Sequence, residues 1–110
     1  MQFNVEKAEG YTEVTGTGRL NMVAAPRLRE VVADTVAAGN SRIVVNLAST
    51  EFMDSSGLGA LIGCLKVARQ AGGDLRIACV PAQVLMVLKL TSMDRVLTPY
   101  ESVAGAFSGD

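Results

Sequence analysis

The chain has 110 residues, about half of them hydrophobic, and a formal net charge of −1. This size and composition predict a single domain, residues 1–110, with a buried core. The basic residues do not cluster, which argues against direct nucleic acid binding, and no apolar run approaches the roughly 18–20 residues that span a bilayer. The polar first residues do not resemble a signal peptide, so we expect a cytoplasmic protein that is not inserted in a membrane.

The first half of the chain predicts two strands, a helix and a third strand. Strands are predicted at residues 3–7 and 11–17, and the second of them alternates in polarity with a period of two. A helix is predicted from Pro26 to a stop at Gly39-Asn40, because proline suits the first helical turn and apolar residues recur every three or four positions. Residues 42–47 form a β-branched run that is typical of a buried central strand.

The second half predicts helices and strands in alternation. After a turn at 48–50 and a link at 51–53, residues 56–71 show helical spacing of apolar side chains and end at Gly72-Gly73. The remaining predicted elements are a strand at 75–80, a helix at 82–90, a short strand at 95–97 and a weak helix at 101–107.

This order of elements predicts an α/β fold. We expect a mixed, mostly parallel central sheet of about four to five strands, with about four helices packed on it. The strands that helices separate should be parallel, because a crossover helix joins parallel neighbours with a right-handed turn.

Residue types restrict the chemistry that is available to the chain. There is no histidine, which removes Ser-His-Asp and Cys-His catalysis and the commonest ligand of transition metals. Gly57, Gly59 and Gly63 do not form the Gly-x-x-x-x-Gly-Lys-Ser/Thr loop that holds nucleotide phosphates. Cys64 and Cys79 lie in apolar runs and are predicted to be reduced core side chains. We therefore expect a protein that is not an enzyme, with no catalytic residues, no metal and no cofactor.

The segment Asp54-Ser55-Ser56-Gly57 lies where a strand region leads into a helix. The first N–H groups of a helix lack partners within it and the helix dipole adds partial positive charge, so this end accepts an anion such as a phosphate on serine. Gly57 and Gly59 leave the first turn bare, which would let another protein approach the backbone. The same residues are also typical of an ordinary N-cap in which a serine oxygen accepts a backbone N–H, and spacing alone favours that interpretation.

The segment from Asn46-Leu47 to Phe52-Met53-Asp54-Ser55-Ser56-Gly57-Leu58-Gly59 resembles the signature of bacterial anti-sigma-factor antagonists, the single-domain STAS proteins. The likeness covers nearly the whole chain and implies a STAS-like fold. It also includes Gly18-Arg19-Leu20-Asn21, Ala25 and Leu28 around the first helix, Gly72-Gly73-Asp74-Leu75 after the second helix, and residues 87–96 with Thr91-Ser92-Met93-Asp94.

The resemblance implies a phosphorylation-gated binding module that regulates transcription by partner switching. In such systems the partner is an anti-sigma factor that is also a serine kinase of the GHKL ATPase type. The unphosphorylated antagonist binds this kinase and releases the sigma factor. Phosphorylation of the first serine after the aspartate, here Ser55, weakens the complex, and a serine phosphatase restores it. Ser55 is thus the predicted phosphoacceptor, with Ser56 a secondary candidate and the better candidate for the helix cap.

A second part of the partner-binding surface is predicted in the loop before the first helix. The family often has aspartate where this chain has Asn21, which keeps a hydrogen-bonding, helix-capping side chain without the charge, so an unusual kinase is expected. Met22 and Val23 are predicted either to contact the kinase or to pack beneath the loop. The predicted partner-binding residues are Asn21, Met22, Val23, Asp54, Ser55, Ser56, Gly57, Leu58 and Gly59.

An alternative function follows from the same resemblance. STAS-type proteins also serve as cytoplasmic subunits of membrane transporters, for example of a lipid-transport ATPase, and such subunits can keep a serine or threonine at the equivalent site. Binding that does not respond to phosphorylation would favour this alternative.

Overall fold

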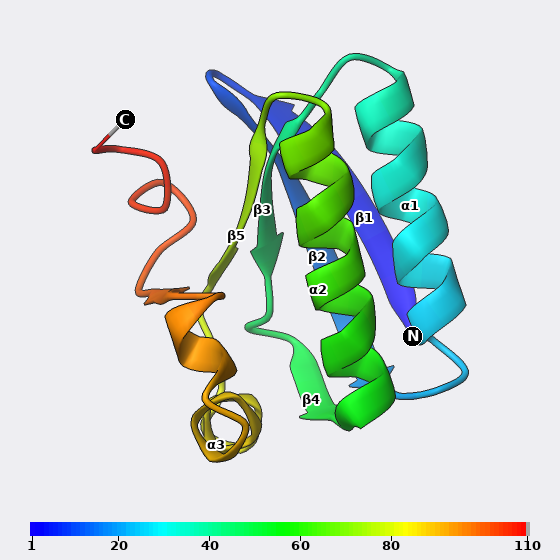
Figure 1. The fold of residues 1–110 in the computed structure, drawn as a ribbon, viewed down its shortest axis with the longest axis vertical. Coiled ribbons are helices and arrows are strands. Elements are labelled where there is room, and N and C mark those ends of the chain that lie inside the picture. Colours follow the sequence, from blue (N-terminus) through cyan, green and yellow to red (C-terminus); the bar gives the residue numbers. More distant parts are fainter. Residues whose placement is uncertain (110) are drawn as a thin grey trace.

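The computed structural model describes residues 1–109, which form one central sheet with helices (Figure 1). The strands are β1 (Gln2–Ala8), β2 (Tyr11–Leu20), β3 (Arg42–Asn46), β4 (Thr50–Met53), β5 (Asp74–Ala78) and β6 (Pro99–Tyr100). The helices are α1 (Ala25–Ala37), α2 (Ser55–Gln70), α3 (Ala82–Leu90) and a 3₁₀ turn, η1 (Met93–Arg95).

The sheet is mixed and mostly parallel, as the sequence predicts. The strand order is β1-β2-β3-β5-β6, and β4 pairs with β2 beside this path. Only the β1–β2 hairpin is antiparallel among the strand pairs of residues 1–109. β2 and β3, which α1 connects, pair in parallel, and so do β3 and β5, with β4 and α2 between them in the chain, which confirms the prediction of parallel strands.

Strand β2 pairs with two different strands along its length. Residues 12–15 pair with β3, whereas residues 18–20 pair with β4. The pairing shifts register between Gly18 and Arg19, and Gly18 has a φ of 114°, a conformation that glycine adopts without steric cost. This break turns the end of β2 toward β4 and so toward the start of α2.

The main core lies between the sheet and the two long helices. α1 and α2 run side by side across one face of the sheet, and α3 packs beside β4 (Figure 1). The core includes fully buried side chains from β2, β3, β5 and each α-helix: Val14, Leu28, Val32, Ile43, Val45, Leu61, Leu65, Ile77, Val84 and Leu88. Alternate residues of each strand point to this face, as the period of two requires.

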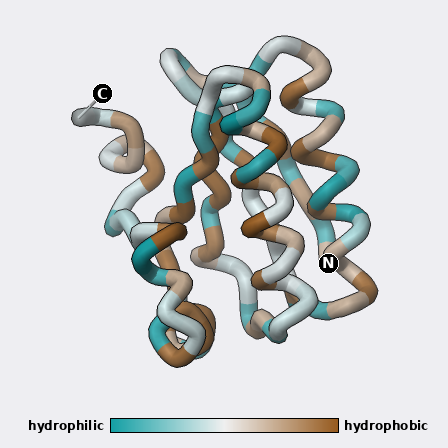
Figure 2. Tube along the Cα trace, in the orientation of Figure 1, coloured by the Kyte–Doolittle hydropathy of each residue, from teal (hydrophilic) through white to brown (hydrophobic). Residues whose placement is uncertain are grey.

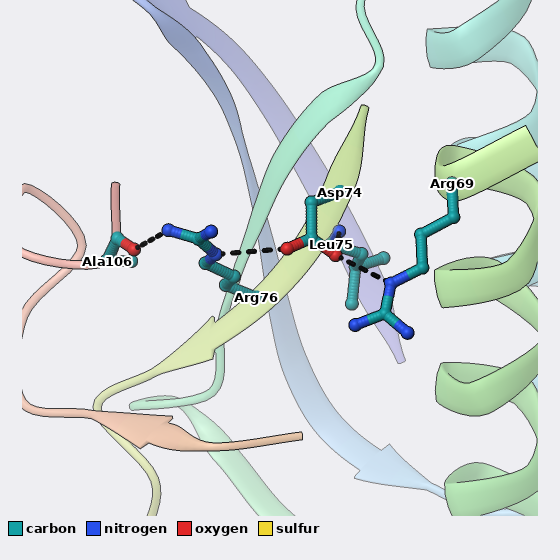
Figure 3. Close-up of polar contacts among 5 residues, drawn as sticks. All are labelled: Arg69, Asp74, Leu75, Arg76 and Ala106. Atoms are coloured by element: carbon teal, nitrogen blue, oxygen red, sulfur yellow. Dashed lines mark hydrogen bonds and ion pairs between the residues drawn. The ribbon is translucent and has the colours of Figure 1, made fainter. Parts of the chain in front are cut away.

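The opposite face of the sheet is covered in part by the C-terminal segment. Val44 and Ala78 point to this face and pack with Ala106 and Phe107. Arg76 on β5 donates from Nη1 to the carbonyl oxygen of Ala106 at 2.8 Å and from Nε to the carboxylate of Asp74 at 3.2 Å (Figure 3). These contacts attach a segment without regular secondary structure to the sheet.

Several predicted helices and strands are confirmed with small changes of boundary. α3 has the predicted bounds, α1 and α2 each begin one residue earlier than predicted, and β2 continues to Leu20 instead of ending at residue 17. The extension of β2 requires a partner for its last residues, and the predicted link at 51–53 is instead part of strand β4. β4 has only four residues, two of them polar, so its strand conformation follows from pairing with β2.

Two predictions near the C-terminus are wrong. The predicted strand at 95–97 is replaced by η1 and the turn after it, and the strand that pairs with β5 is Pro99–Tyr100. The apolar character of residues 95–97 reflects Leu97, which is buried in the core. The predicted helix at 101–107 consists of turns, because burial of Ala106 and Phe107 on the sheet decides the conformation there. Residues 1–109 therefore hold three α-helices where about four were predicted.

None of the helices in residues 1–109 is both long enough and apolar enough to cross a bilayer.

Candidate functional site

The candidate site lies where β2 and β4 end side by side. Leu20 and Met53 are paired as the last residues of these two strands, so Asn21 and Asp54 leave the sheet at the same edge. The N–H of Asp54 donates to the carbonyl oxygen of Leu20 at 3.3 Å, which ties the two exits together. Loops after the carboxyl ends of parallel strands are the usual place for binding sites in α/β folds.

The start of α2 is capped by Asp54 and not by a serine. The backbone of Asp54 is extended, and its Oδ1 accepts the N–H of Gly57 at 2.9 Å. The prediction of Ser56 as the cap is therefore wrong: Ser56 already lies inside the first helical turn, whereas an N-cap has non-helical backbone angles. Ser55 is the first helical residue and is exposed, and Ser56 is half-buried.

The two glycines of the first turns of α2 have different surroundings. A Cβ on Gly57 would overlap with the carbonyl oxygen of Leu20, so this glycine permits the close contact between α2 and β2. A Cβ on Gly59 would meet nothing within 4 Å. Only Gly59 therefore fits the prediction of a bare turn that a partner can approach. Leu58, a further predicted contact residue, is 7% exposed and belongs to the core.

The electrostatic surroundings of Ser55 favour an anion. The N–H groups of Ser55 and Ser56 have no acceptor within α2, because the first turn of a helix offers none. The helix α2 contains no acidic residue, and its dipole adds partial positive charge at this end. The opposing charge is the carboxylate of Asp54, directly before the serine.

The loop before α1 presents apolar side chains to solvent. Asn21 holds the loop: its Oδ1 accepts the N–H groups of Val23 and Ala24, each at 3.1 Å, and its carbonyl oxygen accepts the N–H of Ala25. Met22 is 71% exposed and Val23 is 77% exposed, so the alternative that they pack beneath the loop is wrong. This apolar loop lies at the lower right of the tube, at the start of α1 (Figure 2).

A residue that the sequence did not indicate fixes the last residue of β4. The side-chain amide of Gln83, on α3, accepts the N–H of Met53 at 2.9 Å and donates to its carbonyl oxygen at 3.0 Å. Gln83 is 30 residues away in sequence and lies inside a plain apolar helix. No local pattern marks it, because the contact depends on how α3 docks beside β4.

The cysteines are not arranged for chemistry. Cys64 is buried between α1 and α2; burial raises the pKa of its thiol from 9.0 to about 11, and the nearby charge of Arg29 lowers it in part. Cys79 is half-buried, and its Sγ lies 3.5 Å from the carbonyl oxygen of Glu101. Both are free thiols, and Cys79 packs with the C-terminal segment instead of the main core. Within residues 1–109, no group of three or more histidine, cysteine, aspartate or glutamate side chains is placed to hold a metal ion.

Comparison with known proteins identifies the family of the chain. The family model described as the STAS domain matches residues 2–106, nearly the whole chain. The chain belongs to the STAS-domain family. Similar proteins of this family include a Staphylococcus epidermidis protein named anti-sigma-B factor antagonist, which is 32% identical over 95 residues that cover 84% of this chain and 88% of the relative.

Solved structures of STAS proteins have the same architecture. A crystal structure described as a putative anti-sigma factor antagonist from Thermotoga maritima matches with a TM-score of 0.89 and 25% identity, over 97% of this chain and 92% of that one. The Bacillus cell fate determinant SpoIIAA in its phosphorylated form matches with a TM-score of 0.69, over 92% of this chain and 93% of that one. Its identity is 18%, so this likeness concerns the fold alone.

The fold brings most of the predicted site residues together at one edge. Asn21, Met22 and Val23 follow the end of β2, and Asp54, Ser55, Ser56 and Gly59 follow the end of β4. Gly57 and Leu58 face inward and support the site from below. The edge thus combines an exposed serine on a fixed helix start with a neighbouring apolar loop.

Proposed function

We propose that this chain is an anti-sigma-factor antagonist whose binding to a serine kinase is gated by phosphorylation of Ser55. In its unphosphorylated form it binds an anti-sigma factor of the GHKL kinase type, which releases the sigma factor. Phosphorylation by that kinase weakens the complex, and a serine phosphatase reverses the modification. The observation that carries the proposal is the exposed Ser55 at the start of α2, near the exposed side chains of Met22 and Val23, in a chain that is similar to proteins named anti-sigma-B factor antagonist.

Gating at this position has a plain physical basis. A phosphate on Ser55 adds about −1.5 to −2 charges at neutral pH. Asp54 stands directly before it, and Met22 and Val23 on the neighbouring loop offer apolar contact area. A dianion at the centre of such an interface must give up hydration and is repelled by acidic groups, while the free protein still stabilises it at the helix start.

Ser55 and Ser56 allow a matched test of the phosphoacceptor. The purified chain is incubated with ATP and a GHKL-type anti-sigma-factor kinase from the same organism, and the modified residue is mapped by mass spectrometry. We expect transfer to the wild-type chain and to Ser56→Ala, and none to Ser55→Ala. Transfer that persists in Ser55→Ala, or no transfer to the wild-type chain, would contradict the proposal.

Binding is measured on the same variants by isothermal titration calorimetry. Ser55→Glu introduces a negative charge at the acceptor position and should weaken kinase binding at least about tenfold, equivalent to about 1.4 kcal/mol. Replacing Met22 and Val23 together by serine should also weaken binding while leaving the free energy of unfolding within about 0.5 kcal/mol of the wild-type value, as expected for exposed positions. Replacing Leu90, an exposed residue of α3, by serine is the control for loss of apolar surface.

The transporter-subunit alternative remains a separate prediction. A STAS domain that only docks on a transporter would bind its partner equally well with serine, alanine or glutamate at position 55. A chain with this function would also show no binding to the kinase for the wild type or for any variant, so the calorimetric series discriminates between the two functions.

A further inference from the structure

We infer that Gln83 is a positioning residue for the phosphoacceptor segment, holding Asp54 and Ser55 in the geometry that the kinase recognises. This inference rests on the proposed function and deepens it. Gln83 is on α3, it is 28 positions from Ser55 in sequence, and it acts through the backbone of Met53.

Strand β4 would have unsatisfied backbone groups without Gln83. In a strand the N–H groups of successive residues point to opposite sides. The N–H of Asp54 points toward β2 and donates to Leu20, so the N–H and the carbonyl of Met53 point away from β2. On that side Gln83 supplies one acceptor and one donor, at 2.9 and 3.0 Å, in the way that a neighbouring strand would. The carboxamide can do both at once, because its oxygen accepts and its nitrogen donates.

The two hydrogen bonds fix the residue directly before the helix cap. The side chain of Met53 is fully buried, so its position is set by the core, and Gln83 fixes the backbone. Asp54 follows with its own bonds to Leu20 and Gly57. Ser55 therefore projects from a segment that is held on both sides, and a kinase meets its hydroxyl group already in place.

Helix α3 is firmly anchored, which makes the contact specific. Val84 and Leu88, on the inner side of α3, are fully buried, so Gln83 is held at β4 by the docking of the whole helix. Removing only the amide group leaves this anchoring unchanged. The consequence should be a looser Met53–Ser55 segment in an otherwise intact domain.

The test compares Gln83→Met with Gln70→Met. Methionine keeps the length and much of the volume of glutamine but makes neither hydrogen bond to Met53. Gln70, at the exposed end of α2, is the matched control. Hydrogen exchange of the Met53 and Asp54 amides in Gln83→Met should accelerate by about tenfold or more, because both hydrogen bonds that hold the segment closed from the side of α3 are lost. Core amides of β3 should be unaffected.

Phosphorylation kinetics give the functional readout. If the kinase binds only the ordered segment, the apparent affinity falls in proportion to the ordered fraction. We expect the KM for Gln83→Met to rise several-fold while kcat stays near the wild-type value, because Ser55 and the kinase are unchanged. For Gln70→Met both constants should match the wild type.

Gln83→Glu adds a signature that a general loss of stability would not produce. The ionised carboxylate can accept the N–H of Met53 but faces its carbonyl oxygen without a proton to donate; the protonated acid supplies that proton. Protection of the Met53 amide, corrected for intrinsic exchange, should therefore recover as pH falls through the titration of the introduced carboxyl group, and Gln83→Met should show no such recovery.

The possible failures are distinguishable. Transfer to Ser55 of the wild-type chain with the same KM for Gln83→Met and Gln70→Met would overturn the positioning role alone. Unchanged exchange at Met53 in Gln83→Met would overturn it as well. Absence of transfer to Ser55 in the wild-type chain would overturn the proposed function, and with it the role of Gln83 in kinase recognition.

Discussion

The two long helices begin at neighbouring strand ends but are held there in different ways. α2 begins with the carboxylate of Asp54 as its cap and with Gly57 pressed against β2. α1 begins after a loop in which Asn21 caps a turn, while Ala24, the residue at the N-cap position, makes no side-chain hydrogen bond. Hydrogen bonds and close packing fix the start of α2. The loop before α1 instead leaves its largest apolar side chains, Met22 and Val23, in solvent.

The difference between the two helix starts corresponds to two functions at this edge of the sheet, a modification site and a contact surface. A modification site needs a defined geometry, since a kinase must place its ATP in line with one hydroxyl group. A contact surface needs apolar area that a partner can cover, and the side chains of Met22 and Val23 supply it. The start of α2 therefore holds the serine hydroxyl group in position, and the loop at the start of α1 supplies the apolar surface that a partner contacts.

The largest expected effect tests the close packing of α2. Gly57→Ala places a Cβ against the carbonyl oxygen of Leu20 and should lower the free energy of unfolding by about 3 kcal/mol, the upper end of the usual cost of overpacking. Gly59→Ala is the matched control: it meets open space and should stabilise the helix by about 0.5–1 kcal/mol. Urea unfolding measures both values. Equal effects at the two positions would contradict the close contact between α2 and β2.

A smaller effect tests the buried contact between the two helices. The Sγ of Cys64 lies 3.9 Å from the carbonyl oxygen of Leu28, and burial raises the pKa of this thiol from 9.0 to about 11. The unfolded chain loses this proton first, so stability is complete below pH 9 and falls as pH rises toward 11, by about 2–3 kcal/mol for two pKa units. Urea unfolding at several pH values measures the slope.

Cys64→Ala provides the control for this pH dependence. The variant is less stable at every pH, because it leaves a small cavity, but its loss of stability above pH 9 should be smaller than that of the wild type. An unchanged slope would show that other groups cause the alkaline loss.

The smallest effect compares the two caps directly. Asp54→Ala removes the acceptor for the N–H of Gly57 and should cost about 1 kcal/mol, the usual contribution of an N-cap. Asn21→Ala should cost less, about 0.5 kcal/mol, because it holds an exposed turn and not the first turn of a helix. Thermal unfolding of the two variants measures the difference. A larger loss of stability for Asn21→Ala than for Asp54→Ala would contradict the conclusion that the start of α2 is the more firmly held of the two.

Local patterns predicted the long elements well and the short ones poorly. The apolar spacing after Pro26 and after Ser56 corresponds to α1 and α2, since each helix must bury one continuous face. Strand β4 has too few residues to carry such a pattern. The residues at 101–107 contain helix-forming types, yet the aromatic ring of Phe107 packs on Tyr11 and determines their path.

In the candidate site, too, local sequence predicted one part of the structure and missed another. The motif Asp54-Ser55-Ser56-Gly57 marked the place in the sequence, but the division of roles within it could not be obtained from residue types. Aspartate and serine are nearly equal as caps, and only the point at which the backbone becomes helical decides between them. Gly57 and Gly59 are likewise equivalent in sequence, and only the position of Leu20 distinguishes them.

The sequence by itself determined the α/β class, the positions of the three α-helices, the serine motif and the family to which the chain belongs. These properties depend on periodicity and on contiguous residues, which are visible in one dimension. The tertiary structure decided that β2 changes partners, that Met22 and Val23 remain in solvent, and that Gln83 reaches Met53 from a helix 30 residues away. Such features depend on where separate elements dock, and burial and hydrogen bonding determine docking only when the whole chain is assembled.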